Sequence, residues 1–334
     1  MSSSSVEAFK ALAESVVTQW DCSNPTLTLL KYRENTVFEV RGDHNFRAAL
    51  RIHRQDYHPD SHLEGELSWM AMLAQSGLVV PHPVPTSTGE LMIRANSPDM
   101  PGGWQVDMLS WLDGEILGEI GVPLDLKGRD TAEVFAQVGN TMARLHTASV
   151  HWPVQNETPR HAWDSDGLVG DAPFWGEFWA LQILTPEEKA LILEAREALK
   201  QDFRHYGQTA DNFGLIHADF VPENVMLNGN KIEIIDFDDA GFGWHMFDIV
   251  TALFWLRDEA EFDLMKSAFL SGYQAERSLS ERDLATWDLF MAARSLTYLG
   301  WAHTRPSSDE AKELAPFMVA NAIELCTVYL SGRN

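Results

Sequence analysis

Four polar residues stand at fixed intervals in one short stretch of the chain, L-I-H-A-D-F-V-P-E-N-V-M-L-N-G-N-K-I-E-I-I-D-F-D-D, which covers residues 215–239. They are His217, Asp219, Asn224 and Asp236. Carboxylate and amide oxygens are hard ligands that suit Mg²⁺, which usually takes one or two of them and fills its shell with water and phosphate. Asn224 and Asp236 are therefore candidate metal ligands, and Asp219 can reach the same point from the preceding loop.

A β-hairpin is expected to bring these oxygens together. The apolar run V-M-L is followed by the turn signal N-G-N and by residues 231–235, which alternate polar with apolar side chains. Because a tight turn pairs its two strands antiparallel, Asn224 before the first strand and Asp236 after the second should lie side by side. A lone Asp or Asn more often caps a turn, but the whole set on one hairpin favours a shared site.

The order H-x-D-x-x-x-x-N followed by I-D-F resembles the catalytic loop and metal loop of kinases. This stretch, and the chain more widely from about Leu27 to Leu256, resembles the aminoglycoside phosphotransferase and choline kinase superfamily. Within it, the chain is most similar to the bacterial homoserine-kinase-like and stress-response-kinase-like branches. The resemblance implies an α+β fold of the protein-kinase type, with a small antiparallel β lobe at residues 1–109, a larger and mainly helical lobe at 110–334, and a hinge at about 108–114.

The resemblance also implies an activity, an ATP- and Mg²⁺-dependent phosphotransferase. Its acceptor would be a hydroxyl of a small molecule such as an amino alcohol, a homoserine-like compound or an aminoglycoside. Asp219 would position and deprotonate that hydroxyl, and His217 would support the loop backbone. Asn224 and Asp236 would hold Mg²⁺, while Asp248 would brace the catalytic loop without binding the metal.

Further site residues are implied for the first lobe. The run A-A-L-R, residues 48–51, stands where kinases have V-A-I-K, so Arg51 would be the cation that binds phosphate. Glu66 would orient it from a predicted helix over residues 60–75, and Glu64 is the alternative if the register is shifted. A guanidinium grips phosphate oxygens in a bidentate way but is not interchangeable with the ammonium of Lys.

The adenine and the phosphates would meet other parts of the chain. Asn35 lies where the family has its nucleotide-covering loop, although residues 33–38 contain no G-x-G-x-x-G. Ala49 and Leu227 would lie on the two faces of the adenine ring. The backbone of the predicted hinge, which includes Leu109, would bond the ring's edge. Core packing explains Ala49, Leu109 and Leu227 equally well.

Composition and charge limit the classes of partner that we expect for this protein. The formal net charge of −24 at pH 7 argues against a nucleic-acid partner, because phosphate groups would be repelled, and it is compatible with a cationic acceptor. Two cysteines are too few for a disulfide framework, and the first residues lack the basic and apolar parts of a secretory signal. We find no run with the length and apolarity of a membrane span, and we expect a cytoplasmic protein with no membrane partner. The oligomeric state stays open, and a homodimer is compatible with the sequence.

Three other functions stay open. The short connection from Asp236 to Asp248 lacks the long activation segment of eukaryotic-type protein kinases, which favours a small acceptor, but Ser/Thr kinases of the stress-response type share this short connection. The Arg at position 51 and the missing glycine-rich motif are compatible with a nucleotide-binding pseudokinase. His217, Asp219, Asp236 and Asp238 are also compatible with a metal-dependent hydrolase.

Aromatic residues and helix signals complete the expectations. Trp163, Trp175 and Trp179 are candidates for an aromatic wall around an ammonium group, although core packing is the favoured explanation. His146 is expected to be a packed core histidine. Helices are predicted to begin near Asp130, Thr185 and Ser280, the last running to about residue 301, and to cover residues 247–256 and 311–330.

Overall fold

The computed structural model describes residues 3–32, 35–98 and 100–333, and it divides into two compact units. The first unit comprises Met1–Glu115, Asn156–Pro159 and Asn228–Ile235. The second comprises Ile116–Gln155, Arg160–Leu227 and Asp236–Asn334.

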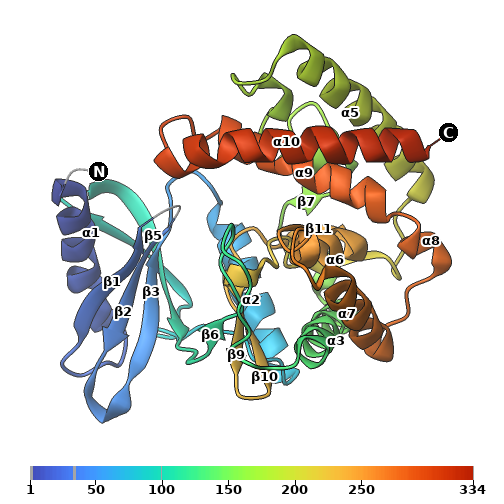
Figure 1. Cartoon of the computed structure of the whole chain (residues 1–334). Helices are drawn as coiled ribbons and strands as arrows, with labels where there is room; N and C mark the ends of the chain where they lie inside the picture. The colour runs from blue at the N-terminus through green and yellow to red at the C-terminus, as the bar shows by residue number, and fades with distance from the viewer. Residues whose placement is uncertain (1–2, 33–34, 99, 334) are drawn as a thin grey trace. The chain divides into compact units, whose positions relative to one another are not determined.

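An antiparallel sheet in the order β1-β2-β3-β5-β4 forms most of the first unit. Its strands are β1 (Thr26–Tyr32), β2 (Thr36–Arg41), β3 (Arg47–Ile52), β4 (Met92–Ser97) and β5 (Met100–Ser110). The helix α1 (Ser3–Val16) covers one face of this sheet (Figure 1). Leu12 and Val16 of α1 are buried there with Phe38, Leu50 and Val106. The predicted β2–β3 hairpin is confirmed, with Phe38 opposite Leu50.

Alternation along β3 separates the core from the polar face. Ala48, Leu50 and Ile52 belong to the core against α1, whereas Arg51 lies on the opposite face, as the period of two requires. The helix α2 (Asp60–Gln75) occupies the predicted residues and buries Glu66 completely, while Glu64 is exposed. The register that makes Glu66 the inward carboxylate is therefore confirmed.

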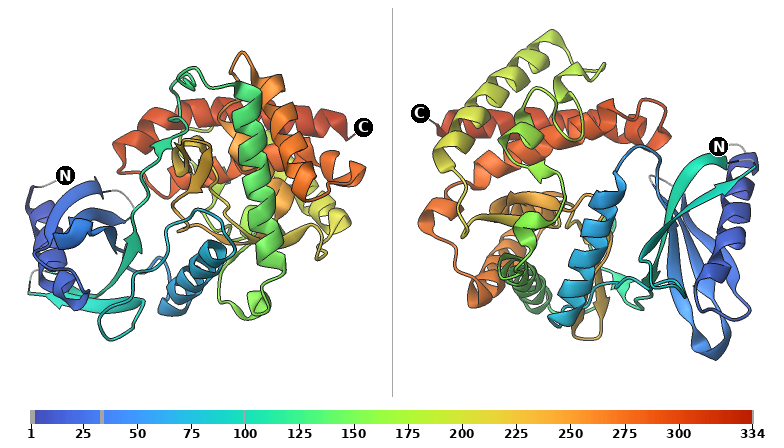
Figure 2. Two further views of the ribbon diagram at one scale, coloured as in Figure 1. Left: turned by 90° about the horizontal axis from the view of Figure 1, so that it is seen from below. Right: turned by 180° about the vertical axis from the view of Figure 1, so that it is seen from behind.

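Helices dominate the second unit. They are α3 (Thr131–Val150), α4 (Ser165–Val169), α5 (Pro186–Tyr206), α6 (His245–Phe254), α7 (Phe262–Glu276), α8 (Glu281–Leu284), α9 (Trp287–His303) and α10 (Asp309–Gly332). Figures 1 and 2 show α3 beside α7, and α10 beside α9 and α5. Glycine permits the first of these crossings, because a Cβ added at Gly139 would lie 2.0 Å from the carbonyl oxygen of Phe269.

Helix starts follow the predicted signals. Asp130 accepts the amide of Glu133 at 2.8 Å, and Thr185 forms a capping box with Glu188. The prediction of one helix from Ser280 to about residue 301 was wrong, because α8 ends at Leu284 and α9 begins at Trp287. The hydroxyl of Thr286 donates to the carbonyl of Asp283 at 2.6 Å, a side-chain bond that competes with continued helix.

Two small sheets carry the motif residues. One has the order β7-β11-β8 and consists of β7 (Ala162–Trp163), β11 (Gly241–Trp244) and β8 (Phe213–Ile216). The other has the order β10-β9-β6 and consists of β10 (Lys231–Ile234), β9 (Val225–Asn228) and β6 (Glu115–Ile116). The predicted hairpin of β9 and β10 is confirmed, and Gly229 in its turn has φ +59°.

The last helix, α10, is long and apolar enough, by length and composition alone, to cross a membrane. The expectation that no segment meets these two criteria was therefore wrong. One face of α10 is nevertheless buried, with Met318, Ala322 and Cys326 among its inward residues, and the helix packs on α9 and α5. Such packing is typical of a core helix, which passes the same test. The cytoplasmic location stays a prediction.

Candidate active site

The loop after β8 turns sharply because a buried carboxylate holds its backbone. Asp248, in the first turn of α6, is fully buried and accepts the amide of His217 at 2.9 Å and that of Ala218 at 2.7 Å. Ala218 has φ +63°, a left-handed conformation that an L-residue rarely adopts. Burial raises the pKa of Asp248, whereas the nearby His217 and the two amides act in the opposite direction. The predicted bracing role of Asp248 is confirmed.

Two side chains fix the carboxylate of Asp219, which follows this turn. Nη2 of Arg294, on α9, donates to Oδ1 of Asp219 at 2.8 Å. Nδ2 of Asn224 donates to Oδ2 of Asp219 at 3.0 Å and to its carbonyl oxygen at 2.9 Å. Asn224 ends the short 3-10 helix Pro222–Asn224 directly before β9. The structure therefore brings Asp219 and Asn224 together as the sequence predicts, and it adds Arg294.

The pairing of β8 with β11 brings the second acidic segment to the same place. Ile216, the last residue of β8, stands opposite Gly241, the first residue of β11. Because the strands are antiparallel, the chain leaves β8 towards Asp219 at the edge where it enters β11 from Asp239. Asp236, which follows β10 and has φ +65°, opens this entering segment.

The pKa of Asp219 reflects the nearby acidic residues. Burial raises the pKa of Asp219 to about 7, the charge of Arg294 opposes the rise, and the negative charges of Asp239 and Asp236 add to it. Three carboxylates in one place disfavour one another, so a bound cation would relieve their repulsion. The donor set of carboxylates and one amide fits Mg²⁺. Nδ2 of Asn224 already donates to Asp219, so its Oδ1 is the atom that remains for a cation.

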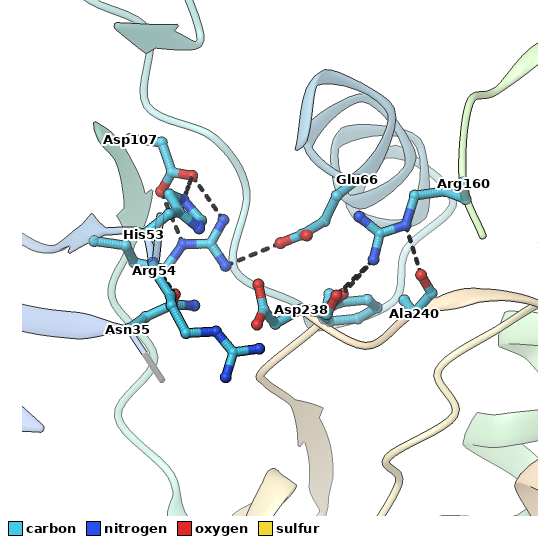
Figure 3. A network of polar contacts seen from close by, with 10 residues as sticks. Asn35, His53, Arg54, Glu66, Asp107, Arg160, Asp238 and Ala240 are labelled. Atoms are coloured by element: carbon cyan, nitrogen blue, oxygen red, sulfur yellow. Dashed lines mark hydrogen bonds and ion pairs between the residues drawn. The ribbon is translucent and has the colours of Figure 1, made fainter. Parts of the chain in front are cut away.

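Side-chain donors hold the segment between Asp236 and β11 through its backbone carbonyls. Arg160 donates from Nη2 to the carbonyl of Asp238 at 2.6 Å and from Nε to the carbonyl of Ala240 at 2.5 Å (Figure 3). Nε1 of Trp163 donates to the carbonyl of Asp239 at 2.8 Å, and Nε1 of Trp175 donates to its Oδ1 at 3.1 Å. The carboxylate of Asp239 is thereby held in a defined direction.

The first unit holds the predicted cation in a network of its own. Arg51 donates from Nη1 to Glu66 at 2.9 Å, and it binds Asp107 through Nε and Nη2, each at 2.8 Å. Nε2 of His53 lies 2.7 Å from Asp107. Figure 3 shows Asp107, His53 and Glu66 of this network. Burial alone would raise the pKa of Asp107, but the charges of Arg51 and His53 outweigh it and lower that pKa. The predicted pairing of Arg51 with Glu66 is present, and Asp107 was not predicted.

The remaining nucleotide predictions are placed but not tested. Oδ1 of Asn35 accepts the amide of Arg54 at 3.0 Å, and Arg33 and Glu34 of the predicted covering loop lie outside the described residues. Ala49 stands opposite Leu109, which is buried. Leu227, also buried, belongs to the second unit.

The predicted hinge at residues 108–114 is only partly free of the sheet. β5 continues to Ser110, whose amide donates to the carbonyl of His82 at 2.9 Å. The carbonyl of Met108 accepts the amide of Val84 at 2.8 Å. These two groups are therefore engaged by residues 82–84, which pair with β5 outside the named strands. Residues 111–114 are the part of the predicted hinge that lies beyond β5.

His217 and His146 of the second unit are buried and contact other core residues. Nδ1 of His217 accepts the amide of Asp219 at 3.3 Å, and its ring packs on Phe237, which matches the predicted support of the loop. His146 is fully buried between the hydroxyl of Tyr273 at 2.8 Å and Asp248 at 3.1 Å. Its predicted place in the core is confirmed.

Trp163 and Trp175 are in edge contact, with ring centroids 5.2 Å apart, whereas Trp179 packs against Phe178. Trp163 is fully buried in the core, as the favoured explanation had it. Trp175 lies under Arg294, whose Cζ is 4.8 Å from the ring centroid. Trp179 lies instead under Arg196 at 4.1 Å. Two guanidinium groups therefore occupy ring faces that an ammonium group would need.

Sequence reasoning missed Arg160, Arg294 and Asp107, and gave no role to Asp239. Each of the three missed residues acts at long range, and Arg294 is 75 residues from Asp219. The doubled acid of D-F-D-D was visible for Asp239, but its direction depends on the β8–β11 pairing. No local spacing marks the others.

Comparisons with known proteins identify the family to which the chain is similar. A model described as "Phosphotransferase enzyme family" matches residues 28–288. The homoserine kinase of Neisseria meningitidis serogroup B is 33% identical over 171 residues, which cover 48% of this chain and 51% of that protein.

Two solved structures share the fold. A microcompartment-associated aminopropanol kinase is 30% identical, with a TM-score of 0.83 and coverage of 97% of this chain and 98% of that one. An amicoumacin kinase in complex with AMP-PNP, Ca²⁺ and Ami has a TM-score of 0.76 at 22% identity, with coverage of 97% of this chain and 96% of that one. The predicted α+β fold of the kinase type is confirmed.

Proposed function

Because the chain belongs to the phosphotransferase enzyme family, we propose that it moves the γ-phosphoryl group of ATP to the hydroxyl of a small amino alcohol. The predicted family and the predicted class, a kinase with an alcohol as acceptor, are confirmed by the match. One observation supports the reaction most strongly: Asp219 lies against Asn224, and the charges of Asp236 and Asp239 act on it.

The residues divide the chemistry between them. The acceptor hydroxyl donates to the carboxylate of Asp219, which takes its proton as the oxygen bonds to the γ-phosphorus and ADP departs. Mg²⁺, held by Oδ1 of Asn224 and the carboxylate of Asp236, would supply positive charge to the phosphate oxygens. Asp248 keeps the loop in place. Most of the rate acceleration would come from positioning the reacting groups.

Arg51 is proposed as the cation that meets the phosphates. Glu66 and Asp107 hold its guanidinium from two directions, so its position is defined before nucleotide binds. Arg51→Lys would keep the charge and lose the fork, and it should raise the KM for ATP more than it lowers kcat. We also propose Asn35 for the nucleotide-covering loop, Ala49 and Leu227 for the two faces of the adenine ring, and the backbone at Leu109 for its edge. The proposed hinge between lobes 1–109 and 110–334 is residues 108–114.

Asp239 gives the acceptor its proposed chemical class. Its carboxylate is held by Trp175 and lies beside Asp219 through the β8–β11 pairing, so it can meet an ammonium group while the hydroxyl meets Asp219. An amino alcohol carries these two groups a few bonds apart. The net charge of −24 favours the approach of a cation. The aminopropanol kinase of similar structure acts on a compound of this class.

One chain supplies every residue named for catalysis. A homodimer is compatible with the sequence but is not needed for this site.

An acceptor screen tests the proposal. ADP release is measured with Mg·ATP and a panel of amino alcohols, homoserine, aminoglycosides, neutral sugars and a generic protein substrate. We expect amino alcohols to exceed their neutral diol analogues by about 10-fold or more in kcat/KM. Asp239→Asn should remove most of that preference by raising the acceptor KM by about 10-fold. If no member of the panel increases ADP release, the proposed reaction is refuted. If only the protein substrate increases it, the acceptor is a protein and not an amino alcohol.

A further inference from the structure

Arg294 is a wholly enclosed cation at the centre of the second unit. It lies in α9, and its side chain is 0% exposed. Three aromatic rings surround its guanidinium, with Cζ 4.3 Å from the centroid of Tyr298, 4.8 Å from that of Trp175 and 5.4 Å from that of Phe247. A buried charge is unfavourable unless it is paired and hydrogen-bonded, so a residue of this kind needs a specific reason.

Two of its hydrogen bonds reach the loop that carries Asp219. Nη1 donates to the carbonyl of Ala218 at 3.1 Å, and Nη2 donates to Oδ1 of Asp219 at 2.8 Å. Nε has no hydrogen-bond partner among the described residues. One rigid fork therefore holds both the strained backbone at Ala218 and the carboxylate that follows it.

The two contacts define a direction for the carboxylate. Arg294 fixes Oδ1 of Asp219, and Asn224 fixes Oδ2 from the other side at 3.0 Å. The carboxylate plane can then no longer rotate about χ2, and each oxygen keeps a lone pair in a set direction. The aromatic rings prevent the guanidinium from moving away.

We propose that Arg294 is the positioning residue of the phosphoryl-transfer reaction, which orients Asp219 towards the acceptor hydroxyl through its bonds to Oδ1 and to the Ala218 carbonyl. This role rests on the proposed function of Asp219. Arg294 does not touch the acceptor or the nucleotide. It acts through Asp219, so its loss lowers kcat and leaves the binding of Mg·ATP intact.

The test compares Arg294→Lys and Arg294→Met with the wild type. Lys keeps the charge but reaches only one of the two oxygens, so we expect the order wild type, Lys, Met in kcat, with about a 100-fold loss for Met. The KM for acceptor and the Kd for Mg·ATP should change little. If Arg294→Met does not fold, Arg294→Lys decides on its own, because its kcat must fall while its circular dichroism and nucleotide affinity stay normal.

Arg196 offers a matched control. Like Arg294, it binds backbone carbonyl and carboxylate oxygens, here the carbonyls of Val169 and Gly170 and the carboxylate of Asp171, and it covers a tryptophan ring. Arg196→Met should lower the melting temperature and leave kcat unchanged. An equal loss of kcat in both variants would show that Arg294 only stabilises the fold.

A double-mutant cycle separates this proposal from the proposed function. In an Asp219→Asn background, Arg294→Lys should have no further effect on kcat, because it acts through that carboxylate. Additive losses would overturn the positioning role while leaving the phosphotransferase assignment standing. A wild type that transfers phosphate to no acceptor would overturn the proposed function instead.

Discussion

Oδ1 of Asp248 accepts the amide of Ala218 at 2.7 Å, and Ala218 has φ +63°. A left-handed L-residue is disfavoured, and such strain persists where the surrounding structure imposes it. Here the imposing group is a fully buried carboxylate on α6. The turn it enforces sets where Asp219 emerges from β8, so this bond connects the fold directly to the chemistry.

Asp248→Asn should weaken both the loop and the reaction. The amide keeps one acceptor oxygen and introduces a donor, so it cannot accept both the His217 and Ala218 amides. We expect a loss of about 1–3 kcal/mol in the free energy of unfolding, measured by urea titration, together with a reduced kcat. Asp171→Asn is the control, because the side chain of Asp171 is 97% exposed and its ion pairs contribute little. Equal stability of both variants would contradict the bracing role.

Substitutions at Ala218 test the backbone conformation itself. Glycine tolerates positive φ, so Ala218→Gly should change the free energy of unfolding by less than about 1 kcal/mol. A β-branched side chain does not tolerate it, and Ala218→Val should be destabilising by more than about 2 kcal/mol, partly because the site is fully buried. Thermal unfolding of the two variants makes the comparison. A valine variant as stable as the glycine variant would mean that this residue is not left-handed.

The buried network of the first unit predicts a pH dependence. The pKa of Asp107 is lowered in the folded state, so its ion pair with Arg51 stabilises the fold fully above the ordinary carboxyl pKa. That contribution is lost as the pH falls below about 4 towards the lower folded value. Asp107→Asn should be destabilising by about 3–5 kcal/mol at pH 7, because it leaves Arg51 buried with one ionic partner fewer.

The difference between Asp107→Asn and the wild type should then shrink when urea titrations are repeated at pH 5, 4 and 3. The sign follows because only the wild type has a carboxylate to protonate. A difference that stays constant, or grows, over this range would show that the ion pair is not what stabilises this part of the sheet.

Features set by interactions between neighbouring residues could be predicted from the sequence, and features set by contacts between distant residues could not. The β9–β10 hairpin, the helix that carries Glu66 and the capped starts at Asp130 and Thr185 were predictable, because turn chemistry, periodicity and caps are encoded within a few residues. The ordered motif also predicted that Asp219 and Asn224 meet.

The contacts that could not be predicted join single residues that are far apart in the chain. Arg294 reaches Asp219 across 75 residues, and Asp107 reaches Arg51 across 56. The β8–β11 pairing that places Asp239 depends on where two four-residue strands meet, and neither has a turn that joins it to the other. The break between α8 and α9 coincides with a bond from the hydroxyl of Thr286 to the carbonyl of Asp283.

The central claim is that Asp219 is the group that receives the acceptor's proton. The most direct measurement is the pair kcat and Mg·ATP Kd for Asp219→Asn, with the best acceptor from the screen. We predict a fall of about 1,000-fold or more in kcat with an unchanged Kd, because the amide keeps the shape of the side chain but cannot take the proton. A variant that turns over ATP and acceptor at nearly the normal rate would contradict the account.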